Sequence, residues 1–277
     1  YLSKDIKFMA IQRANRETKF QPIHVTKKIH IPEYLCFGNW DKNIYEKKTN
    51  LKSITPIGSL IASLAIRNVK KKKLKINKKK YDVCLIAESE DPDAIQDPTK
   101  SDADGFVTTL HDAVGTLAEF THRFCKKYKL KLVFASRGYG EFSNKRKEEK
   151  RFYKKYLKNY NFQPTRLRNK YSTYIYIMQS RVVIGHNTTA VREALGLNRK
   201  IFHCSFSGFS GFDYPSKFKF SSNKNSYAIF EKELLKILGM SDQKYFKVLG
   251  EGKNLIMYRC DKTLELVRNK VVKYLLN

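Results

Sequence analysis

The stretch SRVVIGHNTTAVREALGLNRKIFHCSFSGFSGFDYP, residues 180–215, decides the fold of this chain. It contains a short apolar run, Arg181 to Ile184, of the kind that forms a buried parallel strand. Cap-forming residues interrupt the run at 186–189, and good helix formers follow from Ala190 to Leu197. A second apolar run covers Lys200 to Cys204. The order predicts a strand, a polar turn, a helix and a second strand.

The polar turn at 186–189 has the composition of an anion-binding site. A helix that begins beside the carboxyl end of a parallel strand presents free backbone N–H groups, and its dipole favours negative charge there. We therefore interpret the turn as the place where the phosphates of a nucleotide-activated donor bind. The alternative is an ordinary strand–helix–strand unit with a well-capped helix.

Length and composition are those of a chain that can bury a sizeable core. The 277 residues are 42% hydrophobic, enough for one large domain or one and a half ordinary ones. No apolar run reaches the roughly 18 residues of a membrane span, and no signal peptide opens the chain. Because the sequence begins at Tyr1 within what reads as folded sequence, we expect that an upstream part is missing.

The five cysteines have no CxxC spacing. Cys84 and Cys204 lie in apolar runs and are expected to be small buried hydrophobic residues. This pattern argues against a zinc site or a disulfide framework and favours a reducing, cytoplasmic compartment.

The formal net charge of +29 predicts an anionic partner. Nucleic acid, an acidic membrane surface and phosphorylated substrates all fit that description. Much of the excess is lysine mixed with Asn, Ile and Tyr, so drift in surface composition is the competing explanation.

The rest of the chain alternates between strand-like and helix-like segments. Strands are expected at 6–12, 34–37, 54–59, 81–88, 130–136 and 163–168, and helices at 41–48, 59–67, 109–128, 143–160, 173–179, 226–238 and 264–276. A lysine-dense linker at 70–80 separates the first group from the regular alternation that begins at Tyr81. Strands that alternate with helices predict a Rossmann-like parallel sheet covered by helices.

In such a sheet, ligands bind at the carboxyl ends of the strands. Four small, polar loops are expected there: Gly58–Ser59, Glu88–Glu90, Ser136–Gly140 and His186–Thr189. Four such loops together favour a ligand crevice. Arg137 is the best candidate to neutralise a leaving diphosphate, although an exposed arginine at a loop start is the alternative.

The helix that follows the polar turn offers further candidates. Asn187, Thr188 and Thr189 could offer amides and hydroxyls to a diphosphate, and N-capping is their alternative role. Glu193 could accept hydrogen bonds from a ribose diol, or it could simply complement the helix dipole. Arg192 is expected to face solvent. His186 could act near the donor or be a structural hydrogen-bonding group.

Two other stretches are candidate sites. Residues 205–211 could shape a sugar pocket or form only a flexible turn. The acidic loop at 88–105 contains two Asp-x-Asp pairs, at 91–93 and 102–104, which we interpret as solvated charge rather than a metal site. The absence of GxSxG, P-loop and GxGxxG patterns argues against serine hydrolases, P-loop NTPases and NAD enzymes.

Three stretches resemble GT-B glycosyltransferases, in particular bacterial surface-carbohydrate (capsule or O-antigen type) biosynthesis proteins. They are KFMAIQRANRE to ITPIGS (7–59), YDVCLIAES to LKLVFASRG (81–138), and VVIGHNTTAVREALGLNRKIFHCSFSG (182–208). The resemblance implies that residues 1–58 end an N-terminal, acceptor-side α/β domain and that 59–277 form a nucleotide-sugar-binding Rossmann-like domain with a C-terminal helix.

The resemblance also implies which residues of this chain bind the donor, most of them small or acidic. Thr188 and Thr189 match the diphosphate turn, Glu193 the ribose ligand and Gly58 the hinge glycine. The predicted donor site comprises Gly58, Ser59, Glu88, Ser136, Asn187, Thr188, Thr189 and Glu193, and the predicted catalytic residues are Arg137 and His186. His186 and Asn187 stand where the family usually has a smaller residue.

The implied activity is transfer of a sugar from a nucleotide-activated donor to a surface polysaccharide or lipid-linked acceptor, with no cofactor and no metal. The basic helix at 143–160 could contact an anionic membrane at the inner face of the plasma membrane, or it could pack its aromatic stripe into the core. No specific nucleic acid is expected as a partner. The alternatives are a basic nucleic-acid-binding protein and a sugar-nucleotide epimerase or hydrolase of the same fold.

Overall fold

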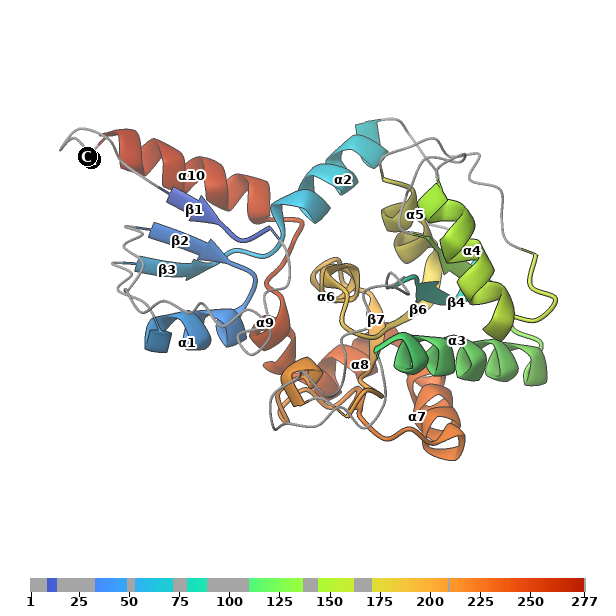
Figure 1. The fold of residues 1–277 in the computed structure, drawn as a ribbon. Coiled ribbons are helices and arrows are strands. Elements are labelled where there is room, and N and C mark those ends of the chain that lie inside the picture. Colours follow the sequence, from blue (N-terminus) through green and yellow to red (C-terminus); the bar gives the residue numbers. More distant parts are fainter. Residues whose placement is uncertain are drawn as a thin grey trace.

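The computed structural model of the protein describes residues 9–13, 33–48, 53–71, 79–88, 110–136, 144–161, 171–208 and 210–276. Two parallel sheets with helices packed against them make up this part of the chain (Figure 1). The predicted α/β class, with a helix-covered parallel sheet and part of a second α/β unit, is confirmed.

The first sheet has three strands, β1 (Met9–Ile11), β2 (Glu33–Cys36) and β3 (Ser53–Pro56), in that spatial order. Both strand pairs are parallel. Helix α1 (Asn39–Lys48) covers one face of this sheet, and α10 (Thr263–Leu276) runs along the other (Figure 1). The strands expected near the start of the chain therefore form, although residues 6–8 lie outside the described part.

The second sheet has the order β5-β4-β6-β7-β8, and every neighbouring pair is parallel. Its strands are β4 (Tyr81–Ile86), β5 (Leu132–Ala135), β6 (Ser180–Gly185), β7 (Lys200–Cys204) and β8 (Ser221–Ser222). The central strands are almost wholly buried because helices cover both faces, which explains their unbroken apolar sequences.

The predicted helices form with shifts of a few residues at their ends. They are α2 (Leu60–Lys71), α3 (Leu110–Lys127), α4 (Asn144–Tyr156), α5 (Ser172–Gln179), α6 (Thr189–Gly196) and α7 (Tyr227–Gly239), together with α1 and α10. The strand expected at 163–168 lies outside the described residues.

Two helices were not predicted, α8 (Asp242–Leu249) and α9 (Gly252–Ile256). The sequence does contain a start signal for α8, a serine at position 241. In the structure Ser241 is the N-cap, and its hydroxyl accepts a hydrogen bond from the Lys244 N–H. Tyr245 and Leu249, four residues apart, are both buried. Helix α9 is too short to show a periodicity.

The aromatic residues of α4 pack inward, as one of the two interpretations of this helix proposed. Phe152 and Tyr153 are buried, and the rings of Phe134 and Tyr153 lie 4.4 Å apart. Gly115 allows α3 to approach α4, because a Cβ there would lie 2.2 Å from the Tyr156 ring. The five cysteines are all free and buried, as expected for Cys84 and Cys204.

The last helix returns to the first sheet. The Thr263 hydroxyl donates to the Ile57 carbonyl at 2.6 Å, and the Lys270 ammonium pairs with Glu33 at 2.6 Å. Just after β3, Gly58 has a φ of +83°, and a Cβ there would lie 2.8 Å from the Tyr258 carbonyl oxygen. Residues of α10 thus contact residues on the N-terminal side of position 58. The division of the chain into two domains at residue 58 stays a prediction.

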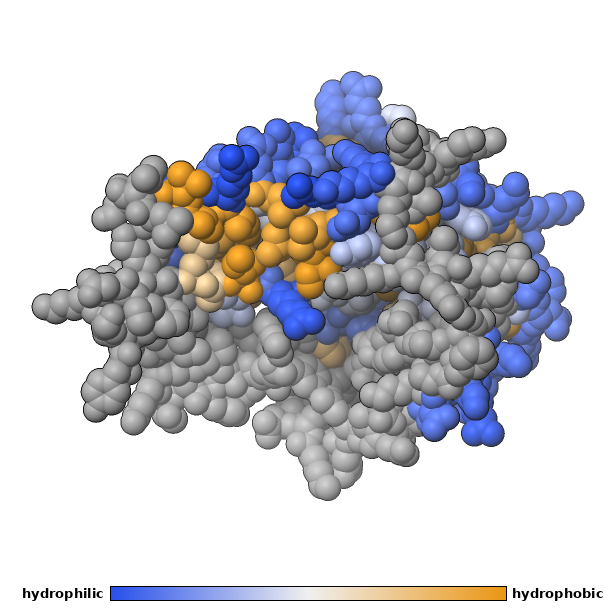
Figure 2. Space-filling view, turned by 90° about the horizontal axis from the view of Figure 1, so that it is seen from above, coloured by the Kyte–Doolittle hydropathy of each residue, from blue (hydrophilic) through white to orange (hydrophobic). Residues whose placement is uncertain are grey.

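Within the described residues, no helix combines the length and the apolar character required to cross a bilayer. Hydrophobic residues gather in one patch on the face seen from above, and hydrophilic residues surround much of it (Figure 2).

Candidate functional site

The strand order of the second sheet identifies its switch point. From β4 the chain moves to β5 on one side, and it then returns to place β6 on the other side of β4. In open parallel sheets, ligands bind at the carboxyl ends of the two strands where the order reverses. Glu88 follows β4 and His186 follows β6, so both lie at this position.

A hydrogen bond joins the two sides of the switch point. The backbone N–H of Asn187 donates to the Glu88 carboxylate at 2.8 Å, and the Glu88 N–H donates to the Tyr153 hydroxyl at 2.8 Å. The Glu88 side chain is buried, and its Oε2 atom lies 3.7 Å from His186 Nδ1. Glu88 thus fixes the turn before α6 against β4.

The N-terminus of α6 is the part of this helix that reaches solvent. Residues 187–190 are half-buried, whereas 191–197 are buried. Thr188 is the N-cap, and its hydroxyl accepts from the Ala190 N–H at 3.3 Å. The turn packs tightly on the helix, since a Cβ on Gly185 would lie 2.5 Å from a Val191 methyl group. Of the three residues with a predicted capping role, Thr188 is the one that caps the helix, and this role is compatible with anion binding at the same N-terminus.

Glu193 is buried one turn into α6. Its two carboxylate oxygens accept hydrogen bonds from the Ser59 hydroxyl at 2.5 Å and the Tyr174 hydroxyl at 2.8 Å. Burial raises the pKa of Glu193 to about 7, although the two hydrogen bonds and Arg192 act in the opposite direction. Its role as a ribose ligand stays a prediction. Tyr174 was not identified from the sequence, because nothing in its local pattern distinguishes it from a core tyrosine.

The loop Gly58–Ser59 follows β3 of the first sheet, so the expectation that all four polar loops end strands of one sheet is wrong. Ser59 nevertheless reaches the site through its hydrogen bond to Glu193. Its hydroxyl also accepts from the Ala62 N–H at 3.1 Å and caps α2. A sequence cannot show which of two sheets a strand joins, because pairing is a long-range property.

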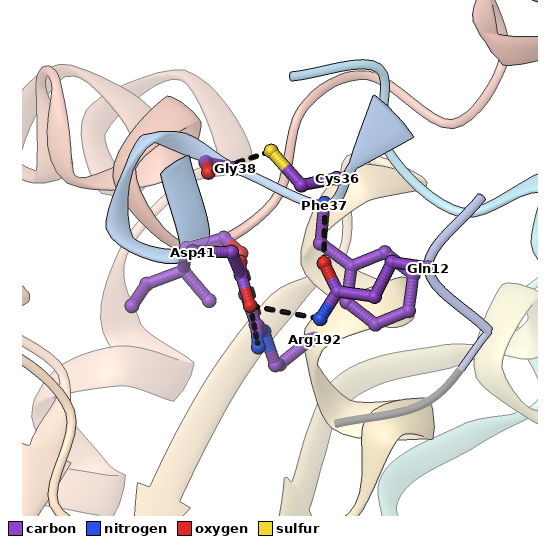
Figure 3. A network of polar contacts seen from close by, with 7 residues as sticks. Gln12, Cys36, Phe37, Gly38, Asp41 and Arg192 are labelled. Carbon is purple, nitrogen blue, oxygen red and sulfur yellow. Dashed lines mark hydrogen bonds and ion pairs between the residues drawn. The ribbon is translucent and has the colours of Figure 1, made fainter. Parts of the chain in front are cut away.

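Arg192 does not face solvent, and this prediction is wrong. Its side chain is 0% exposed. The guanidinium donates to both carboxylate oxygens of Asp41 on α1 (Figure 3). It also donates to the Ile256 carbonyl in α9. The rings of Phe37 and Trp40 lie 5.2 and 5.3 Å from it. The helix has no solvent face here because α9 packs against it and Asp41, Phe37 and Trp40 surround the guanidinium.

The Arg192 contact extends into the first sheet. Gln12, directly after β1, donates from its side-chain amide to Asp41 at 2.8 Å and accepts from the Phe37 N–H at 2.9 Å. Burial opposes the charge on Arg192, but Asp41 outweighs it, so the pKa of Arg192 lies above its ordinary value. The carboxyl ends of β1 and β2 are thereby tied to α6 through one buried ion pair.

Several predicted residues lie at the margin of the site or outside the described chain. Ser136 follows β5 and is half-buried, and its carbonyl accepts from the Thr173 hydroxyl at 3.4 Å. Arg137 and the two Asp-x-Asp pairs fall on residues that the structure does not describe. Among the residues that it does describe, no three His, Cys, Asp or Glu side chains gather where a metal ion could bind.

Several solved structures are similar to this chain in fold. The wall teichoic acid polymerase TagF superposes with a TM-score of 0.50 at 12% identity, over 89% of this chain and 60% of that one. A "putative UDP-N-acetylglucosamine 2-epimerase" from Listeria monocytogenes gives 0.48 at 10% identity, over 88% and 60%. A glycosyltransferase from Rickettsia africae gives 0.43 at 12% identity, over 96% and 71%.

The chain spans about 60% of the length of the first two of these structures. No curated protein sequence matches it. At these identities the TagF match shows a shared fold and no more.

Residues 9–253 match the family described as "putative O-antigen biosynthesis protein". The chain belongs to this family. The resemblance to surface-carbohydrate biosynthesis proteins, inferred from three stretches of sequence, is therefore confirmed.

Proposed function

We propose that this protein is a GT-B-type glycosyltransferase that transfers a sugar from a nucleotide-sugar donor to a glycan or lipid-linked acceptor in O-antigen biosynthesis. Family membership supports the biological context, and the fold shared with TagF supports the enzyme class. The observation that carries the proposal is the half-buried N-terminus of α6, which Glu88 holds at the switch point of the sheet.

In this proposal the donor diphosphate binds at the turn 187–189, where the helix dipole and backbone N–H groups favour negative charge. Ser59, Glu88, Ser136 and Gly58 shape the crevice around it, and Glu193 binds the ribose. Arg137 and His186 act on the departing phosphate. One well-placed donor to a developing anion lowers a barrier by about 2.7–4 kcal/mol, so helix and side chains supply the stabilisation without an obligatory metal.

We expect nucleotide binding to raise the melting temperature. A donor at about 100 times its Kd stabilises the folded state by about 2.7 kcal/mol. UDP-, GDP- and CMP-sugars, tested in turn by differential scanning fluorimetry, should give a shift with one of the bases. Thr189→Ala combined with Glu193→Ala should abolish that shift, because the variant lacks a phosphate-turn hydroxyl and the ribose carboxylate.

The ligand-induced shift, rather than the melting temperature itself, is the informative quantity, since Glu193 also holds Ser59 and Tyr174. Thr121→Ala is a matched control: it removes a buried hydroxyl that donates to the Leu117 carbonyl at 2.7 Å within α3. It should lower stability but keep the shift. If no nucleotide shifts the wild type, donor binding is refuted. Product analysis with and without acceptor distinguishes transfer from the epimerase or hydrolase alternatives.

We also propose that the basic face of α4 makes peripheral contact with an anionic membrane surface, where a lipid-linked acceptor would lie. Five cations line an open hollow of about 580 Å³ on this helix: Lys147, Lys150, Arg151, Lys154 and Lys155. The aromatic residues of α4 face the core, so the outward face contributes charge rather than apolar insertion.

This contact predicts charge-dependent binding to vesicles. Replacing Lys150 and Lys154 by Glu should weaken co-sedimentation with phosphatidylglycerol vesicles by at least ~30-fold, at about 1 kcal/mol for each lysine near the surface. Lys244→Glu with Lys247→Glu, on the exposed face of α8, makes the same change in net charge and should have little effect. Equal losses in the two variants would contradict a specific face. Tighter binding to a nonspecific DNA duplex than to vesicles would favour the nucleic-acid alternative.

A further inference from the structure

Helices α2 and α10 expose aliphatic side chains on one face of the molecule. Four of these side chains are between 36% and 47% exposed: Ile61 and Leu64 on α2, and Val271 and Val272 on α10. The two helices contact each other near their N-terminal ends, where a backbone N–H of α10 donates to the Ser63 hydroxyl at 3.3 Å. Both helices lie in the upper part of Figure 1, and the hydrophobic patch of Figure 2 is seen from that side. We call the surface formed by the four side chains the α2–α10 face.

Helix α10 carries an apolar residue on the side that points away from the first sheet. Thr263 and Lys270 contact the first sheet unit, through the Ile57 carbonyl and the Glu33 carboxylate. Successive residues of an α-helix are about 100° apart, so Val272 lies about 200° beyond Lys270, on the opposite side of the helix. Single exposed apolar residues are common in proteins, but a cluster of four on two adjacent helices indicates that another surface covers them.

Cations flank the α2–α10 face, and acidic residues are scarce there. The exposed cations of the two helices are Arg67, Lys70 and Lys71 on α2, and Arg268 and Lys273 on α10. Glu265 is the single acidic residue in the sequences of these helices, and Lys262 pairs with it at 3.2 Å. A second copy of this chain would place cations against cations, which opposes association. The flanking charges therefore favour an anionic partner.

The apolar residues of this face are aliphatic, which favours lipid over protein as the partner. Hot spots of protein–protein interfaces are enriched in Trp, Tyr and Arg, whereas Leu and Val are under-represented there. Surfaces that combine apolar side chains with lysine and arginine bind anionic bilayers, and their apolar side enters about 5–10 Å into the boundary between headgroups and acyl chains. Basic residues near such a surface add electrostatic attraction. An anionic lipid surface thus matches both the centre of the face and its flanks.

We propose that the α2–α10 face docks on an anionic lipid surface, and that its four aliphatic side chains enter the interface. This contact is apolar at its centre, so it is distinct from the charge contact proposed for α4, and it does not depend on donor binding. Because α10 covers one face of the first sheet, docking through this helix places the first sheet directly behind it at the lipid surface (Figure 1).

The first test is co-sedimentation with phosphatidylglycerol vesicles at physiological ionic strength. Val271→Ser with Val272→Ser should weaken binding about 10-fold or more, because two aliphatic side chains no longer leave water. The variant keeps the net charge of the protein. Ile229→Ser with Leu235→Ser is the matched control, because these residues are 40% and 41% exposed on α7, at the bottom of Figure 1. The control variant should bind within about 2-fold of the wild type.

A fluorophore at position 272 tests insertion directly. The five native cysteines are buried, so a maleimide dye reaches the thiol that Val272→Cys introduces. A polarity-sensitive dye there should emit at shorter wavelength when phosphatidylglycerol vesicles are added, and should respond much less to uncharged phosphatidylcholine vesicles. The same dye on Lys244→Cys, an exposed position of α8, should not respond. A vesicle-bound protein whose dye at position 272 stays in water overturns the proposal.

The outcomes separate the two membrane contacts. If Lys150→Glu with Lys154→Glu abolishes vesicle binding and the double valine variant does not, α4 alone makes the contact and docking by the α2–α10 face is overturned. The reverse result refutes the α4 contact and supports this face. A wild type that binds no vesicle, or an equal loss in the α7 control, also overturns the proposal. So does light scattering that shows a dimeric wild type and a monomeric double valine variant, because a second copy then covers the face.

Discussion

Arg192→Met should lower the free energy of unfolding by about 3–5 kcal/mol, because it leaves the buried Asp41 carboxylate without its cation. Among the described residues, Asp41 would keep the hydrogen bond from Gln12, and the Ile256 carbonyl would lose the guanidinium donor. Urea denaturation followed by circular dichroism measures the change. The expected loss is a large share of the 5–15 kcal/mol that stabilises a typical domain.

Two further variants keep this prediction falsifiable. Arg259→Met removes the exposed ion pair between Arg259 and Asp261, whose side chains are 50% and 35% exposed, and should cost less than about 1 kcal/mol. The double variant Asp41→Leu with Arg192→Met should be more stable than either single variant, because no unpaired charge is buried. Losses that simply add, or a loss at Arg192 no larger than at Arg259, would show that the pair is not a buried unit.

Glu193→Gln should remove a pH dependence of stability that the wild type has between about pH 4.5 and 7. The pKa of Glu193 is raised from 4.5 to about 7, first by burial, so the folded protein holds a proton that the unfolded chain has released. That contribution is present below pH 4.5 and is lost as the pH rises through 7. The difference in unfolding free energy between wild type and Glu193→Gln should therefore fall with pH, by up to about 1.4 kcal/mol per unit.

The half-buried carboxylate of Glu231 provides a control of opposite sign. The hydrogen bond from Lys127 lowers the pKa of Glu231, so its contribution is present above its unfolded pKa and is lost as the pH falls. Glu231→Gln should give a small difference that rises with pH. If the Glu193→Gln difference is flat from pH 4.5 to 7, the carboxyl is ionised throughout that range and its burial does not control it.

The sheet and the phosphate turn were predictable because their signals are local. Buried parallel strands have unbroken apolar sequences, as in β6 and β7, and capping residues mark the start of α6. Glu88 could be placed beside the turn without knowing any contact, because the carboxyl ends of parallel strands meet at one edge. The hydrogen bond between Glu88 and Asn187 agrees with that placement.

What the sequence did not predict depends on pairs of residues far apart in the chain. The helical periodicity predicts that Arg192 lies at the surface. Its charge can be buried because the Asp41 carboxylate, 151 positions away in the chain, forms an ion pair with it. Ser59 was placed at the right site but on the wrong sheet, for the same reason.

The return of α10 to the first sheet also bears on how the protein is made. Thr263 binds Ile57 across 206 positions, and Lys270 binds Glu33 across 237. At a synthesis rate of about 5–20 residues per second, a ribosome needs roughly 10–40 seconds to cover the first of these separations. The second sheet can be completed as its strands emerge, but the first sheet lacks its contacts with α10 until residues 263–276 have left the tunnel. Of the two sheets in the described chain, the one that is made first is therefore the one that is completed last.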